Sequence, residues 1–119
     1  MTQLSGVTLA YMGDAIYEVL IREMLLKQGI QKVDNLHKNA IKYTSAVGRN
    51  KAVECILDSL SEEELSIYKR GRNASGERKA KNASVMEYRK ATGLEALFGF
   101  LYLEKRNQRI YELLEEIMK

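Results

Sequence analysis

No proline occurs anywhere in the 119 residues of this chain, and that absence constrains its fold more than any other feature. Proline ends helices because its ring removes a backbone N–H donor and clashes with the preceding turn. The segments between the eight glycines are dominated by Leu, Glu, Lys and Ala, which favour helix. No segment of useful length alternates apolar and polar residues as a half-buried strand does. The sequence therefore predicts an all-α fold.

The size and charge of the chain predict a single domain over residues 1–119. Its apolar fraction of 45% is ordinary, and its net charge of +3 is too small to keep such a chain expanded. No apolar run approaches the roughly 20 residues that a membrane-spanning helix needs. The first residues also lack the basic start and apolar core of a secretory signal. We therefore expect a cytoplasmic protein without a membrane partner.

Helix-terminating and capping residues divide the chain into six expected helices. They cover residues 4–28, 34–44, 46–60, 61–70, 84–105 and 108–118. Ser-x-x-Glu capping boxes open the fourth and fifth of these helices. Gly29 suits the left-handed position that follows a helix, and Gly71 is expected to end the fourth helix. Residues 72–83 show no apolar period and are predicted to form an exposed loop.

Two acidic residues lie where the helical pattern places apolar side chains. At 100° per residue, Asp14 falls in an apolar stripe of the first helix and Glu95 falls among apolar and small residues of the fifth. A buried carboxylate is costly unless it has a cation, a shared proton or a hydrogen-bonded cap. Small neighbours would let the two helices approach until both carboxylates meet at one ion, an arrangement that suits Mg²⁺. The alternative is that Asp14 and Glu95 are buried ion-pair partners of an Arg or a Lys, or that they lie at the mouth of a groove.

A metal ion at that position would be held by oxygen atoms. The chain has one cysteine, Cys55, and one histidine, His37, which cannot form a Cys/His zinc site. Glu18 lies one turn after Asp14 and could join the site. The simpler interpretation is that Glu18 forms an ion pair with Arg22, four residues further along the same helix.

Positive charge is concentrated between Lys69 and Lys81. This stretch contains six bases and one acid, so the remainder of the chain carries a net negative charge. A basic loop of this kind suits a polyanion, with phosphate as the obvious target. The residues expected to make such contacts are Arg70, Arg72, Asn73, Arg78, Lys79 and Lys81. The alternative interpretation is a charge run that is merely solvated.

Four segments resemble a known family. Residues 9–16, Leu-Ala-Tyr-Met-Gly-Asp-Ala-Ile, resemble the ribonuclease III motif Leu-Glu-Phe-Leu-Gly-Asp-Ala-Val. Residues 92–99, Thr-Gly-Leu-Glu-Ala-Leu-Phe-Gly, resemble its second motif, Asp-Thr-Val-Glu-Ala-Leu-Ile-Gly. Asn-Leu-His-Lys at 35–38 and Lys-Arg-Gly-Arg-Asn-Ala at 69–74 are closer still to the short branch called Mini-ribonuclease III. The order and spacing of these segments make the resemblance specific, and it covers the full chain.

The resemblance implies the compact helical fold of a ribonuclease III catalytic domain, without a separate double-stranded RNA-binding domain. It implies a homodimeric, Mg²⁺-dependent endoribonuclease that cleaves double-stranded RNA with a metal-activated water and leaves 5′-phosphate ends. The role associated with this branch is maturation of large-subunit (23S) ribosomal RNA. Asp14 and Glu95 match the family's metal-binding acids, so they are the expected catalytic and metal-ligating residues. The basic run and the dimer surface would then hold the RNA backbone.

Two positions depart from the ribonuclease III pattern. Ala10 stands where the first motif has Glu, and Thr92 stands where the second motif has Asp. Fewer carboxylates predict weak Mg²⁺ binding that tightens when RNA phosphates complete the coordination, and they leave open whether one or two ions bind. The same departures favour the alternative function, a non-cleaving RNA-binding or ribosome-assembly protein on the same fold.

Overall fold

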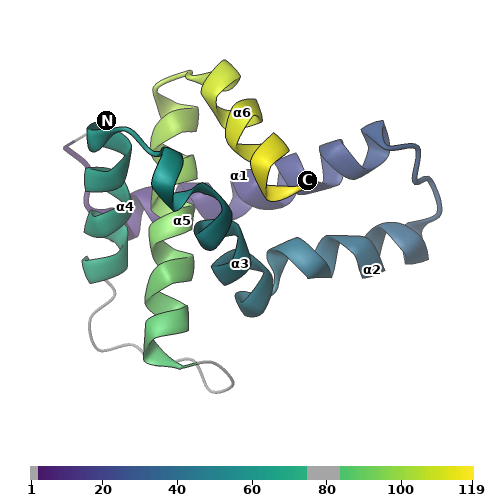
Figure 1. Cartoon of the computed structure of the whole chain (residues 1–119), viewed down its shortest axis with the longest axis horizontal. Helices are drawn as coiled ribbons and strands as arrows, with labels where there is room; N and C mark the ends of the chain where they lie inside the picture. Colours follow the sequence, from purple (N-terminus) through teal and green to yellow (C-terminus); the bar gives the residue numbers. More distant parts are fainter. Residues whose placement is uncertain (1–2, 75–83) are drawn as a thin grey trace.

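The computed structural model describes residues 3–74 and 84–119, and its described part consists of α-helices, a short 3₁₀ helix and connecting turns (Figure 1). The elements are α1 (Gly6–Lys27), α2 (Val33–Thr44), α3 (Ala46–Ile56), the 3₁₀ helix η1 (Leu57–Ser59), α4 (Glu62–Ala74), α5 (Val85–Leu103) and α6 (Asn107–Ile117). This arrangement confirms the predicted all-α fold. None of the described helices is long and apolar enough to cross a bilayer.

The fifth helix, α5, forms the centre of the fold. Every residue from Ala91 to Leu101 is buried except Glu95, because α1, α3, α4 and α6 all pack against this helix. Figure 1 shows α5 in green between α4 and α3, with α1 crossing it and α2 running back beside the second half of α1.

Two glycines allow α1 and α5 to cross in close contact. A Cβ atom on Gly13 would overlap the carbonyl oxygen of Glu95, and one on Gly99 would overlap the carbonyl oxygen of Leu9. Glycine lets the two backbones approach because it has no side chain to separate them. This crossing brings Asp14, the residue after Gly13, next to Glu95.

The predicted helix-capping signals are present in the structure. The Ser61 N–H donates to Glu64 Oε1 at 2.9 Å, and Ser61 Oγ accepts from the Glu64 N–H at 3.1 Å. The Ser84–Glu87 box is formed in the same way, with distances of 2.9 and 3.0 Å. Gly29 has φ of 91°, as expected for the residue that turns the chain away from the end of α1.

The end of α4 was predicted wrongly. The helix continues through Gly71 to Ala74, so residues 72–74 are helical rather than part of a loop. Gly71 is buried, and a Cβ there would lie 2.5 Å from the Ala96 Cβ and 2.9 Å from the Thr92 carbonyl oxygen. This glycine therefore serves the packing of α4 on α5 and does not end the helix. The rest of the predicted loop, residues 75–83, lies outside the described residues.

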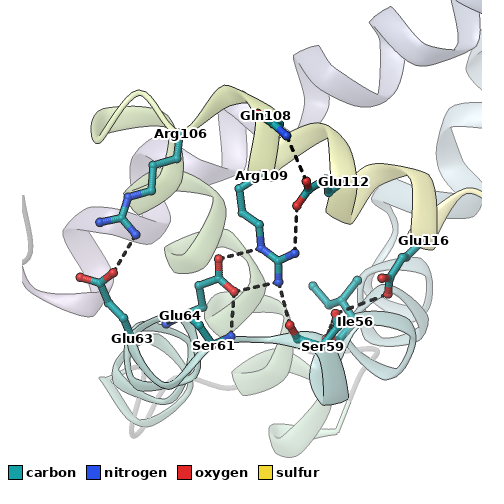
Figure 2. Close-up of polar contacts among 10 residues, drawn as sticks. All are labelled: Ile56, Ser59, Ser61, Glu63, Glu64, Arg106, Gln108, Arg109, Glu112 and Glu116. Atoms are coloured by element: carbon teal, nitrogen blue, oxygen red, sulfur yellow. Dashed lines mark hydrogen bonds and ion pairs between the residues drawn. The ribbon is translucent and has the colours of Figure 1, made fainter.

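A polar network attaches α6 to the start of α4 (Figure 2). Arg109 donates from Nε to Glu64 Oε2 at 2.8 Å, and from Nη2 to Glu64 Oε1 at 2.9 Å and to the Ser59 carbonyl oxygen at 2.7 Å. The Glu64 side chain is only 5% exposed. Burial alone would raise the pKa of Glu64, but hydrogen bonds from Arg109 and Ser61 hold it below its usual value. This carboxylate therefore stays ionised inside the fold.

Replacing Arg109 by Ala is expected to lower the free energy of unfolding by about 3 kcal/mol at neutral pH, because it leaves the buried Glu64 carboxylate without its cation. The pKa of Glu64 is lower in the folded chain than its usual value, so its stabilising contribution is present above the usual carboxyl pKa and is lost as the pH falls below it. The cost of the substitution is therefore expected to shrink in acid. Urea unfolding at neutral and acidic pH measures both effects.

The matched control is Arg106→Ala, three residues earlier in the chain, where a separate ion pair lies beside this network (Figure 2). Arg106 pairs with Glu63 at 2.7 Å, but these side chains are 38% and 47% exposed. Solvent screens such a pair, so we expect a loss of at most about 1 kcal/mol. Equal losses in the two variants would contradict the assigned role of Arg109.

Candidate functional site

Asp14 on α1 and Glu95 on α5 converge on one cation, and that cation is the guanidinium of Arg49 on α3. Arg49 Nη1 lies 3.0 Å from Asp14 Oδ1 and 2.7 Å from Glu95 Oε2. Glu18, one turn after Asp14, places its Oε1 3.5 Å from Arg49 Nη2. Glu18 also pairs with Arg22 at 3.9 Å, as its spacing suggested. We call Asp14, Glu18 and Glu95 the acidic cluster.

Arg49 is anchored from several directions. Its side chain is only 6% exposed, and its Nε donates to the carbonyl oxygen of Thr44, the last residue of α2, at 2.9 Å. Carbonyl groups at a helix C-terminus favour a nearby positive charge. The guanidinium carbon also lies 5.0 Å from the centre of the Tyr17 ring, within the range of a cation–π contact. The guanidinium is therefore held in place even apart from its contacts with the acids.

The sequence of α3 explains why an arginine is buried there. Arg49 precedes Ala52, Val53 and Ile56 by three, four and seven residues, and all three are buried. These spacings place Arg49 on the apolar face of its helix. Arg49 was not predicted as a site residue, although the pattern that singles out Asp14 and Glu95 also singles out this base.

The two principal acids differ in their access to solvent. The Asp14 side chain is 62% exposed and that of Glu95 is 19% exposed. The prediction that Asp14 is buried in an apolar stripe is therefore wrong. Along this side of α1, Ala10, Ile21 and Leu25 are buried, but Val7 and Tyr11 lie at the surface. Asp14 thus forms the open side of the acidic cluster, and Glu95 forms its inner side.

Burial changes the acidity of the inner carboxyl group. The pKa of Glu95 is raised to about 7, because burial and the charge of Asp14 together outweigh the lowering effect of Arg49. A perturbed carboxyl group beside an exposed one is typical of functional sites, although structural ion pairs also produce it. Burial thus favours the protonated form of Glu95, whereas the ion pair with Arg49 favours the carboxylate.

The donor atoms of the acidic cluster suit a hard cation, but the cluster is not arranged as a ready metal site. Carboxylate oxygens are the ligands that Mg²⁺ prefers. Ala10 and Thr92 are both buried, and the Thr92 hydroxyl donates to the Tyr88 carbonyl oxygen at 3.0 Å. Within residues 3–74 and 84–119, no three His, Cys, Asp or Glu side chains are grouped so that they could hold a metal ion. The structure instead contains the alternative arrangement, in which Asp14 and Glu95 form ion pairs with an arginine, Arg49.

The predicted RNA-contacting residues fall into two sets. Arg70, Arg72 and Asn73 lie on the last turns of α4, where Arg70 Nη1 donates to the Leu4 carbonyl oxygen at 3.2 Å. Arg72 donates from Nε to Asn73 Oδ1 at 3.2 Å, and its guanidinium carbon lies 5.8 Å from the centre of the Tyr68 ring. The second set, Arg78, Lys79 and Lys81, lies outside the described residues.

Exposed apolar side chains lie along α1 on either side of Asp14 in the sequence. They form two pairs, Val7 and Tyr11 before Asp14 and Val19 and Leu26 after it, all 52–83% exposed, and we call these four residues the α1 outer face. Contiguous apolar side chains on a surface mark interaction sites more often than isolated ones do. The open side of the acidic cluster therefore adjoins a surface suited to contact with another molecule.

Known proteins resemble this chain over nearly its whole length. The ribonuclease III domain family matches residues 7–106. A protein of Enterococcus faecalis named Mini-ribonuclease 3 is 45% identical over 98% of this chain and 90% of its own length. A Staphylococcus aureus protein of the same name is 42% identical over 97% of this chain and 87% of its own length. The crystal structure of a Fusobacterium nucleatum protein superposes with a TM-score of 0.85 at 33% identity, and the match covers 98% of this chain and 93% of that one.

Proposed function

Because this chain belongs to the ribonuclease III family, we propose that it is an endoribonuclease that cleaves double-stranded RNA and requires Mg²⁺. The observation that carries the proposal is the meeting of Asp14 and Glu95, from two helices, at a single cation position. The proposed substrate is a precursor of large-subunit (23S) ribosomal RNA, cut in the cytoplasm to leave 5′-phosphate ends. Cleavage of an RNA duplex with and without Mg²⁺ tests this function.

Asp14 and Glu95 have different proposed roles in the acidic cluster. Asp14 and Glu95 would hold Mg²⁺, which neutralises charge on the phosphodiester and lowers the pKa of a bound water. Asp14 faces solvent, so a phosphate on the surface of the molecule can approach it. Glu95 lies deeper and is fixed by Arg49, so it sets the inner boundary of the site.

A non-cleaving RNA-binding protein is the second candidate function. Ala10 and Thr92 remove two acids that ribonuclease III carries, and Arg49 already neutralises part of the remaining charge. The partly buried Glu95 is an argument against this candidate. A protein that only binds RNA would not need this acid, because replacing an ion-paired buried acid by an apolar residue is often neutral or stabilising. We therefore favour the nuclease.

The basic run from Lys69 to Lys81 is the proposed contact with the RNA backbone. Replacing Arg72 by Ala is expected to weaken binding to all duplexes alike and to reduce the slope of log affinity against log salt by about one. The reason is that RNA binding releases one fewer counterion for each protein cation that no longer contacts a phosphate. Filter binding across a salt series measures both quantities. The control, Arg72→Lys, keeps the charge and is expected to retain the slope. An unchanged slope in Arg72→Ala would show that Arg72 does not contact the RNA backbone.

The α1 outer face is the proposed contact between two copies of the chain. Tyr11 is 83% exposed and lies one helical turn before Asp14, so pairing through this face would bring two acidic clusters near each other. Two neighbouring sites would allow one dimer to cut both strands of a duplex.

Replacing Tyr11 by Asp is expected to convert a dimer into a monomer, with dissociation constants at least about thirtyfold weaker, because a charge would have to be buried in an apolar contact. Sedimentation equilibrium measures the change. The control is Val47→Asp, which places the same charge on a 54% exposed side chain at the start of α3. Dissociation by Val47→Asp and not by Tyr11→Asp would place the contact elsewhere.

A further inference from the structure

Arg49 occupies the position that a bound metal ion would need. A single nitrogen, Nη1, contacts one oxygen of Asp14 and one of Glu95, at 3.0 and 2.7 Å. The second terminal nitrogen, Nη2, contacts Glu18 at 3.5 Å. The same carboxylates that would bind Mg²⁺ therefore already have an intramolecular cation as their partner.

We propose that Arg49 is an internal counter-ion that keeps the affinity of the acidic cluster for divalent metal low. Asp14 and Glu95 must loosen or share their contacts with its guanidinium before they can hold Mg²⁺. This inference rests on the proposed function, because it assigns a regulation to the same site.

Contacts other than those with the acids hold the Arg49 guanidinium in the site. Its hydrogen bond to the Thr44 carbonyl oxygen at 2.9 Å and its packing on the Tyr17 ring do not involve the acids. When Asp14 and Glu95 turn toward a metal ion, these contacts keep the guanidinium close by. Because the side chain is only 6% exposed, water screens the repulsion between guanidinium and metal poorly. Arg49 therefore opposes metal binding and does not simply move away.

The substrate can relieve this repulsion. An RNA phosphate beside Asp14 adds negative charge to the site, so it compensates for Arg49 and favours the metal ion. By linkage, RNA then tightens metal binding and the metal tightens RNA binding to the same extent. The free protein is expected to bind Mg²⁺ weakly, and the RNA complex more strongly.

Other bases near the cluster are poorer counter-ions. Arg22 contacts Glu18 at 3.9 Å, but its side chain is 74% exposed. Water and salt screen such a charge strongly. Arg22 is therefore a suitable control, because it is a neighbouring base that is exposed and pairs with Glu18 instead of bridging Asp14 and Glu95.

The test is calorimetric titration of the RNA-free protein with Mg²⁺. Arg49→Gln is expected to bind Mg²⁺ at least about tenfold more tightly than the unaltered protein, because a poorly screened positive charge has been removed. Arg49→Lys keeps the charge and is expected to stay close to the unaltered affinity, as is Arg22→Gln. An unchanged affinity in a folded Arg49→Gln protein, or an equal gain in Arg22→Gln, would overturn the proposal.

A second measurement on the unaltered protein does not depend on the folding of any variant. The Arg49 Nε–H, held by the Thr44 carbonyl oxygen, is a reporter for nitrogen-15 NMR. Its signal is expected to shift as Mg²⁺ saturates the site, and a signal that stays unchanged at saturation would overturn the proposal. If the protein cuts duplex RNA with Mg²⁺ but Arg49→Gln leaves the affinity unchanged, only this inference fails. If no protein binds Mg²⁺ and no duplex is cut, the proposed function fails with it.

Discussion

Replacing Asp14 by Asn is expected to slow Mg²⁺-dependent cleavage of duplex RNA by about a thousandfold or more. Asparagine keeps the size of the side chain and one oxygen that can accept from Arg49, but it lacks the charge that holds a metal ion. Loss of a metal-dependent step of this kind corresponds to about 4 kcal/mol or more of transition-state stabilisation. Single-turnover cleavage of a labelled duplex measures the rate.

The fold is expected to tolerate this substitution, because the Asp14 side chain is 62% exposed. Thermal unfolding and duplex binding of Asp14→Asn therefore serve as internal controls. Asp58→Asn, which removes an exposed acid in η1, is the matched variant and is expected to cut at the unaltered rate. Cleavage at the unaltered rate by Asp14→Asn would exclude this residue from the site.

Replacing Gly13 by Ala is expected to cost about 4 kcal/mol or more of folding free energy. The added methyl group would overlap the carbonyl oxygen of Glu95, and a backbone atom cannot move aside as a flexible side chain can. The two helices would have to separate, which also moves Asp14 away from Glu95. Urea unfolding measures the loss of stability.

Gly29→Ala is the control for a glycine that has space around it. A Cβ at Gly29 would meet nothing within 4 Å, but the residue has φ of 91°, a conformation that other residues adopt at a cost. We expect a loss of about 1 kcal/mol from this backbone strain alone. If Gly13→Ala were as stable as Gly29→Ala, the close crossing of α1 and α5 would be wrong.

The secondary structure was predictable because its signals are local. The capping boxes at Ser61 and Ser84 and the glycine after α1 act within a few residues, and all three are present. Gly71 was misread because a glycine that ends a helix and a glycine that packs against a neighbour look alike in sequence. Only the proximity of Ala96, on a helix far along the chain, distinguishes the two roles.

The candidate site was predictable only in part. Helical periodicity singled out Asp14 and Glu95, but it cannot say which parts of a face are covered, so the exposure of Asp14 was missed. Arg49 lies on the apolar face of α3, and its partners are on α1 and α5. Its contribution to the site depends on the packing of three helices, which no local pattern contains.

The most direct test of the nuclease function is cleavage of an end-labelled RNA duplex by the unaltered protein, with Mg²⁺ and with a chelator. The single strand of the same sequence is the matched substrate. We predict that both strands of the duplex are cut only when Mg²⁺ is present, that the products carry 5′-phosphates and that the single strand stays intact. Tight binding of the duplex without cutting in Mg²⁺ would contradict the nuclease and favour the non-cleaving RNA-binding protein.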